Sequence, residues 1–334
     1  MNFKDINNIQ IPEGSVSRIT DSNGFILWEQ GKVFNFLLYE TVDKWNVIVP
    51  NVDYLYNNDI ISNENNSTQQ GKITFQKNLI AIWEEAFARL TNLEYMYIPD
   101  GVTIIQRSAF NQSYLAEVRL PNTLEEIETF AFRYTKLSKV IMPDSVTNLG
   151  YSVFLECNLL ETIQLSNNLK SIPERTFYYC QKLKEITIPN SVTSIEQYAF
   201  YGCKGLKEIT IPNSVTSIEQ YAFYGCSNIE TITLSKLLQT IGEHAFNNCN
   251  IQRYLTIPEN VVSIGDYAFA NNNNLYQITS LAMKAPTIQE NTFFCIAVEV
   301  AAKYCILRVP QGATGYEKWL SYLGQKWTIE YITE

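Results

Sequence analysis

Cysteine is the residue type whose spacing in this sequence most directly suggests chemistry. A ladder of evenly spaced thiols could bind a soft metal ion or carry out redox reactions. No C-x-x-C pair or zinc-type spacing occurs, however, and Ser113, Thr135 and Asn272 take the same place in other copies of the pattern. We therefore interpret the series as a column of small buried side chains, whereas Cys295 and Cys305 lie outside it and would pair only in an oxidising compartment. Five of the seven cysteines follow one another at intervals of 23 residues: Cys157, Cys180, Cys203, Cys226 and Cys249.

Other candidates for catalysis are few. His244 is the only histidine, so any nucleophile–histidine site would depend on this one residue, and it stands at a variable position of the repeat. Glu125, Glu126 and Glu128 form an acidic cluster, and paired carboxylates can hydrolyse glycosides. Nothing in the sequence places a second carboxylate at the required distance, so we interpret the cluster as a solvated edge. No Gly-rich phosphate-binding loop occurs. We expect a non-enzymatic protein with no catalytic residues, no cofactor and no metal site.

These residues lie in a chain that repeats itself. Residues 184–203 and residues 207–226 have the same sequence, KEITIPNSVTSIEQYAFYGC, 23 residues apart. A small residue followed by Phe recurs at steps of 22 to 24 residues, which gives about ten copies. Internal repeats of this length predict a solenoid, in which each copy buries its apolar residues against the next. The recurring pairs begin at Ala86, Ala109, Ala131, Val153, Thr176, Ala199, Ala222, Ala245, Ala268 and Thr292.

Within one copy the apolar pattern changes its period. Leu183, Ile186 and Ile188 predict a short strand, and Pro189 ends it because proline cannot donate to a ladder. A second short extended piece follows. Ala199, Phe200 and Cys203 are three to four residues apart, as in a single turn of helix.

The repeated pattern L-x-x-I-x-I-P-x-S-V-x-x-I-x-x-x-A-F-x-x-C resembles the BspA-like leucine-rich repeats. The resemblance implies a right-handed leucine-rich-repeat solenoid, mainly β with short helical or 3-10 turns, used for attachment and recognition, and it implies no catalytic residues. We expect the solenoid at residues 71–310, with residues 72–75 in a degenerate first repeat. Residues 1–70 would form a small N-terminal β unit that caps and anchors the array. Residues 311–334, which contain Trp319 and Trp327, are similar to the end cap of such arrays.

The first thirty residues carry a second, shorter resemblance. Two apolar runs flank a loop containing Asn-Gly at residues 23–24, which predicts a β-hairpin. Residues 11–28 are similar to N-terminal modules of phage virion structural proteins. The first residues lack the long apolar run of a secretory signal, so a chain that starts at Met1 would be cytoplasmic when made and could leave by assembly into a virus particle.

Bulk composition limits the partners. The 334 residues include 25 basic and 34 acidic side chains, for a net charge of −9, and this balance argues against a nucleic-acid groove or an anionic membrane surface. No apolar stretch approaches the length of a membrane span. The expected partners are a protein or a cell-surface glycan, with other virion subunits contacted through the N-terminal region.

Outward-facing strand positions are the best candidates for function, because stacked strands place them in two parallel columns on one face. The N-terminal end of these columns is rich in aromatic and apolar residues, which interface cores favour. We expect a phage virion component exposed on the virion surface, with an extracellular or cell-surface bacterial adhesin as the alternative. A carbohydrate-active enzyme is the alternative from another class. The candidate binding face consists of Tyr95, Tyr97, Glu117, Arg119, Lys139 and Ile141.

Overall fold

The computed structural model of the chain describes residues 79–297 and 304–332 throughout. Before residue 79 it describes the backbone of five strands and the buried side chain of Ile73. These strands are β1 (Arg18–Thr20), β2 (Ile26–Glu29), β3 (Phe36–Thr41), β4 (Ile60–Asn65) and β5 (Gln70–Phe75).

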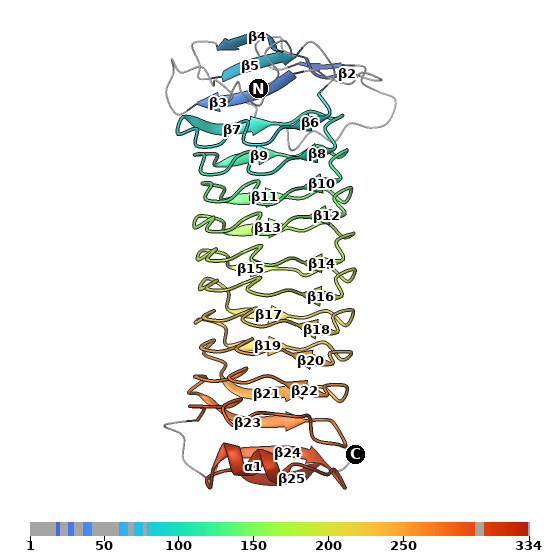
Figure 1. The fold of residues 1–334 in the computed structure, drawn as a ribbon, viewed down its shortest axis with the longest axis vertical. Coiled ribbons are helices and arrows are strands. Elements are labelled where there is room, and N and C mark those ends of the chain that lie inside the picture. Colours follow the sequence, from blue (N-terminus) through green and yellow to red (C-terminus); the bar gives the residue numbers. More distant parts are fainter. Residues whose placement is uncertain are drawn as a thin grey trace.

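Flat coils of chain stack into a rod (Figure 1). Each complete coil contributes one strand to a first column and a two-residue strand to a second column. Over the described residues the first column contains β7 (Leu93–Tyr97), β9 (Glu117–Arg119), β11 (Lys139–Ile141), β13 (Thr162–Gln164), β15 (Glu185–Ile186), β17 (Glu208–Thr210), β19 (Thr231–Thr233), β21 (Arg253–Ile257), β23 (Leu275–Ser280), β24 (Ile306–Pro310) and β25 (Thr328–Ile332). The second contains β6 (Ala81–Ile82), β8 (Ile104–Ile105), β10 (Glu126–Ile127), β12 (Asn148–Leu149), β14 (Ser171–Ile172), β16 (Ser194–Ile195), β18 (Ser217–Ile218), β20 (Thr240–Ile241) and β22 (Ser263–Ile264). The solenoid predicted from the repeats is therefore confirmed.

Paired coil strands are parallel in both columns, and they are in register except for a shift between Arg253 and Tyr254 in β21. Ile209 pairs with Ile232 in the first column, and Ile195 pairs with Ile218 in the second. Because one repeat length separates the partners, equivalent residues lie directly above one another, and apolar residues such as Ile209, Ile195 and Ile218 point into the coil.

A ladder of phenylalanine rings forms the centre of the rod. Phe200 and Phe223 lie in successive coils with ring centroids 4.9 Å apart and planes 4° apart, and both are fully buried. The same stacking continues at every step from Phe87 to Phe293. A single coil could not bury such a ring, so the stack is the source of the hydrophobic stabilisation.

The third side of each coil differs from the prediction, because the expected turn of helix is absent. Along residues 198–203 the backbone N–H groups bond alternately to the next coil and within their own coil. Ala199 N–H donates to Glu196 O (3.2 Å), whereas Phe200 N–H donates to Ala222 O (2.7 Å). In a helix every N–H would bond within the coil. Here half of them form a third ladder of backbone hydrogen bonds between coils, so no helical turn is present.

The alternation requires residues with positive φ at two places in most coils. Tyr198 has φ 59° and Gly202, four residues later, has φ 70°. Other coils place non-glycine residues at the second place, for example Asn248 with φ 58°. The spacing of apolar residues does not reveal this conformation, because a helical turn would put Ala199 and Cys203 on one face as well.

Different elements flank the two ends of the stack. At the N-terminal end β3 pairs with β7 and with β5 in antiparallel fashion, so β3 lies between β5 and β7 in one sheet. The antiparallel pair β1–β2 lies where the hairpin was expected. Most of residues 1–78 lie outside the described residues, and the division at residues 70 and 310 stays a prediction.

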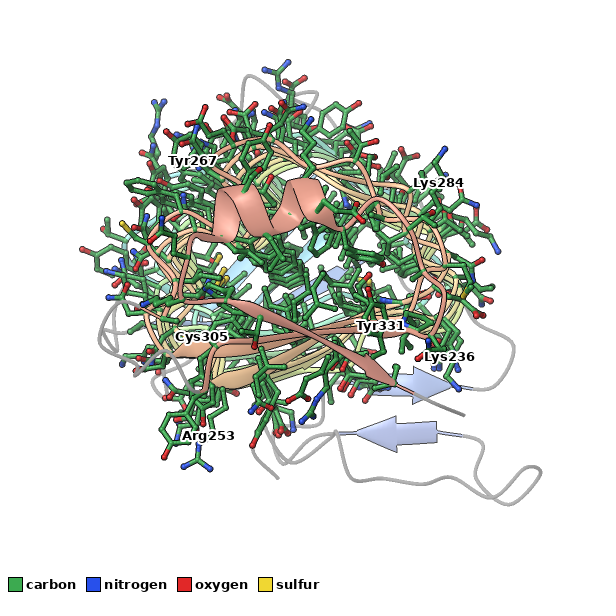
Figure 2. The ribbon with its side chains drawn as sticks, turned by 90° about the horizontal axis from the view of Figure 1, so that it is seen from below. Lys236, Arg253, Tyr267, Lys284, Cys305 and Tyr331 are labelled. Atoms are coloured by element: carbon green, nitrogen blue, oxygen red, sulfur yellow. The ribbon has the colours of Figure 1, made fainter. Side chains whose placement is uncertain are left out.

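At the C-terminal end a short helix, α1 (Glu317–Leu323), lies across the last coils, as Figure 2 shows from below. Its Trp319 packs on Phe293, with ring centroids 5.4 Å apart, and donates from Nε1 to Pro286 O at 3.0 Å. The buried Tyr316 hydroxyl donates to Ala282 O at 2.8 Å. The described part of the chain contains no helix with the length and apolar character needed to cross a membrane.

A column of polar residues at the corner after each first strand gives a stability prediction. Asn168 Nδ2 donates to Asp144 O (2.7 Å) and Asn260 Nδ2 donates to Lys236 O (2.8 Å), which ties each coil to the one before. Ser191 occupies the same repeat position, but its buried hydroxyl has no hydrogen-bond partner. We expect Ser191→Asn to restore this bond and raise the free energy of unfolding by about 1 kcal/mol in urea titrations. Ser191→Ala, which removes the orphan hydroxyl without adding a donor, is the control, and a destabilised Ser191→Asn would contradict the prediction.

Candidate binding face

The outer face of the first strand column is hollowed over its N-terminal half. One hollow of about 540 Å³ lies over β7, β9 and β11. A second, of about 850 Å³, lies over β11, β13, β15 and β17. Lys139 and Ile141 line both, so the two form one groove along the face.

All six residues of the candidate binding face line the first hollow, over β7, β9 and β11, but they differ in exposure. Lys139 and Ile141 are exposed, and Ile141 leaves 48% of its surface open to solvent. Glu117 and Arg119 are half-buried. The two exposed members of the candidate binding face, Lys139 and Ile141, therefore lie at the centre of the groove, where its two hollows meet.

Tyr95 and Tyr97, expected to face outward, are nearly covered, with 1% and 4% of their surfaces exposed. β3 pairs along β7, so the strand that carries both residues lies inside a sheet and not at its edge. The Arg119 guanidinium lies 5.0 Å from the centroid of the Tyr97 ring. Burial raises the pKa of Tyr97 to about 12, although the positive charge of Arg119 opposes this shift. The phenol therefore stays neutral, and its ring packs against the Arg119 guanidinium.

The C-terminal half of the same face carries aromatic residues that the sequence did not single out. Tyr254 is 59% exposed and Tyr304 is 47% exposed. The ring of Tyr276 lies 6.2 Å from that of Tyr254 and 6.4 Å from that of Tyr304, tilted by 56° and 55°. We call these three residues the tyrosine cluster. The repeat pattern places Tyr254 in the outward column, one repeat after Thr231. A register shift between Arg253 and Tyr254 changes which residues of β23 lie beside it, so the pattern does not predict the cluster.

One outward column also becomes uniform over this half. Thr210 pairs with Thr233, and Thr256 with Thr279, so hydroxyls repeat once per coil. Four of the five are exposed and Thr279 is half-buried. We call this column the threonine ladder: Thr187, Thr210, Thr233, Thr256 and Thr279.

The cysteine column has a structural explanation. Each of its five thiols is fully buried and donates from Sγ to a phenylalanine carbonyl of the preceding coil, for example Cys203 to Phe177 O at 3.1 Å. Burial raises the pKa of Cys157 and Cys226 to about 12, so these groups remain neutral thiols, which neither attack substrates nor bind metals. No cluster of His, Cys, Asp or Glu suited to a metal ion occurs among the described residues. Cys295 is exposed and Cys305 is buried.

His244 is one rung of an aromatic ladder on the third side of the rod. Its ring stacks on Tyr221 at 4.6 Å and on Tyr267 at 4.9 Å, with its Nδ1 2.8 Å from Asn247 Nδ2. No nucleophile–base pair is formed around it by these contacts, so it replaces tyrosine as a packing residue.

Two members of the acidic cluster reach a third hollow, of about 520 Å³, beside the second strand column. Glu126 and Glu128 line it together with Glu174 and Arg175, and Glu125 does not. Glu128 Oε2 accepts a bond from the Arg107 backbone N–H at 2.7 Å, and Glu174 pairs with Arg175. Glu128 therefore binds a backbone amide, and Glu174 binds a guanidinium group.

Parallel strands stacked in register, an apolar ladder within and a groove along one strand face define a leucine-rich-repeat solenoid. The model of the BspA type leucine-rich repeat region (6 copies) matches residues 59–184, 148–276 and 194–300. The chain belongs to this family, and the resemblance drawn from the repeats is confirmed. Members of the family are often surface proteins or adhesins.

Solved structures of bacterial leucine-rich repeat proteins are similar in sequence over part of their length. A leucine rich cell surface protein of Faecalibacterium prausnitzii is 31% identical, with 61% of this chain and 57% of that chain covered, at a TM-score of 0.42. The chain thus spans little more than half of that protein. A leucine-rich repeat protein of Bacteroides ovatus is 20% identical, with 82% of this chain and 91% of that chain covered, at a TM-score of 0.35. No curated protein matches the chain.

Proposed function

We propose that the chain is a non-enzymatic binding protein that attaches to a macromolecular partner through the outer face of its first strand column. The observation that carries the proposal is the continuous groove over β7 to β17, with Lys139 and Ile141 at its centre. A rigid stack of strands fixes the positions of these side chains, so little conformational entropy is lost on binding. Membership of a family rich in surface proteins and adhesins supports the same role.

The groove predicts a clear result for a charge reversal. We expect Lys139→Glu combined with Ile141→Asp to reduce binding to a protein or glycan array at least tenfold, because it removes a cation and an apolar contact at the centre of the interface. Both residues are exposed, so the thermal midpoint should change little. The control, Lys236→Glu with Val262→Asp, introduces the same two acidic residues at exposed positions outside the lining of the groove. Equal binding by both double variants would reject the groove as the site.

The surface on which the protein works has two candidate settings. Family membership favours a bacterial cell surface or an extracellular location. The resemblance of residues 11–28 favours the surface of a phage virion, with the N-terminal region contacting other virion subunits; most of these residues lie outside the described part of the chain. Detection by mass spectrometry in washed bacterial envelopes supports the first setting, and detection in purified virions supports the second.

Catalysis on carbohydrates is the rival activity, and its candidates are the carboxylates of the third hollow. If the purified protein released sugars from a glycan, and Glu128→Gln abolished this release, the binding role would be replaced by a hydrolase. We expect no release, because Glu128 and Glu174 are engaged by Arg107 and Arg175.

A further inference from the structure

The threonine ladder and the tyrosine cluster adjoin the groove on the same strand face. Gln164, Thr187 and Thr210 line the second hollow, over β11 to β17, so the threonine ladder continues from this hollow toward the C-terminal end. Tyr254 and Thr256 are two residues apart in β21 and both exposed, so they project from the same side of the strand. The ladder and the cluster thus form one surface.

From this surface we propose that the C-terminal half of the strand face binds a neutral, extended polysaccharide whose chain runs along the axis of the rod. The inference rests on the proposed function, since it names the partner of the same face. Three properties of the surface favour this ligand.

The first property is the repeat distance. Paired strands lie about 4.8 Å apart, and the phenylalanine rings of these coils are 4.9, 5.1 and 5.4 Å apart, so the ladder presents one hydroxyl per coil at a similar step. A ligand that satisfies all five must repeat at a similar interval. An extended polysaccharide advances by a comparable length per sugar. An extended peptide presents side chains to one face only every ~6.7 Å, so its side chains would not match the spacing of the threonine hydroxyls.

The second property is charge. The column from Gln164 through the threonine ladder contains no charged side chain, although the chain as a whole carries −9. The neighbouring column contributes Glu185 and Glu208, both exposed, whose carboxylates accept hydrogen bonds from sugar hydroxyls and repel anionic polymers. The surface therefore complements a neutral glycan and disfavours an acidic one.

The third property is the geometry of the tyrosine cluster. On the third side of the rod, tyrosine rings such as Tyr201 and Tyr224 stack face to face at 4.9 Å and cover one another. In the cluster the rings are tilted by more than 50° and lie more than 6 Å apart, so parts of their faces stay open. The electron-rich face of an aromatic ring attracts the C–H groups of a sugar, and the cluster would hold one end of the chain.

Affinity electrophoresis of the full chain through gels containing a soluble neutral β-glucan tests the proposal. We expect the protein to be retarded by the neutral glucan and not by an acidic polysaccharide such as polygalacturonate. Thr210→Val with Thr233→Val keeps the branched shape but removes two hydroxyls, and should weaken retardation at least fivefold. Tyr254→Ala should weaken it as well, whereas Thr210→Ser with Thr233→Ser should retain it.

Thr147→Val with Thr193→Val is the matched control, because it removes two exposed hydroxyls beside the second column. The proposal would be overturned if the Thr210/Thr233 valine variant were retarded as strongly as the wild type, or if the control lost retardation equally. It would also be overturned if no polysaccharide in a neutral panel retarded the protein. If the panel fails but Lys139→Glu with Ile141→Asp still abolishes capture of a protein on an array, the proposed binding function stands and only the glycan assignment falls.

Discussion

Replacing Phe200 by alanine is expected to lower the free energy of unfolding by about 3–5 kcal/mol. The ring is fully buried between Phe177, 5.2 Å away, and Phe223, 4.9 Å away. Its removal leaves a cavity that the neighbouring coils cannot close, since their strands are held in register on both sides. Urea unfolding followed by circular dichroism measures the change.

A nearby ring provides the control for this substitution. Tyr201 stacks on Tyr224 but is half-exposed, so Tyr201→Ala should cost clearly less than Phe200→Ala. If both variants lost the same stability, or if Phe200→Ala lost less than about 1 kcal/mol, the phenylalanine ladder would not be the core of the rod.

The second large effect is expected at alkaline pH. Burial raises the pKa of Cys157 and Cys226 from 9.0 to about 12, and that of Cys180, Cys203 and Cys249 well above 9.0. Above pH 9 the unfolded chain releases these protons and the folded protein retains them, so the free energy of unfolding falls as the pH rises. The stability from these thiols is complete below pH 9 and is lost between pH 9 and the folded pKa values. Each thiol contributes a slope of about 1.4 kcal/mol per pH unit, and five act together.

Variants separate this effect from other groups that titrate in the same range. Cys203→Ser and Cys226→Ser should each reduce the pH dependence of unfolding between pH 9 and 11 by one thiol's share. Serine suits the column because Ser113 already donates there, to Phe110 O at 2.8 Å. Tyrosines such as Tyr201, whose pKa burial raises to about 12, add the same slope to both variants. Equal slopes for wild type and Cys203→Ser would contradict the explanation.

The sequence was sufficient to predict the stack because the Ala-Phe pair and the cysteine column recur at one interval. A residue that returns every 23 positions must return to the same place in every coil, so Phe200, Phe223 and Cys203 could be placed in the core without coordinates. The conformation of the third side could not be predicted in this way. Its positive-φ residues, such as Tyr198, follow from hydrogen bonds between coils, which the spacing within one coil does not record.

The candidate binding face was predictable in position but not in exposure. Lys139 and Ile141 lie in mid-column, where the neighbours on both sides are repeats, and they are exposed as expected. Tyr95 and Tyr97 lie where the repeat meets β3, and no rule of the repeat describes that antiparallel partner. The tyrosine cluster was missed for the related reason that the register shifts beside Tyr254.

The two identical copies at residues 184–203 and 207–226 allow the number of coils to change without a change in the fold. Excising residues 184–206 would join Leu183 to Lys207, the same Leu-Lys junction that Leu206 and Lys207 form in the intact chain. Phe177 would then meet Phe223 as Phe200 does now, and every ladder would remain continuous. Loss or gain of one such copy would thus shorten or lengthen the rod by one coil, and the distance between its two ends would change while both ends stay intact.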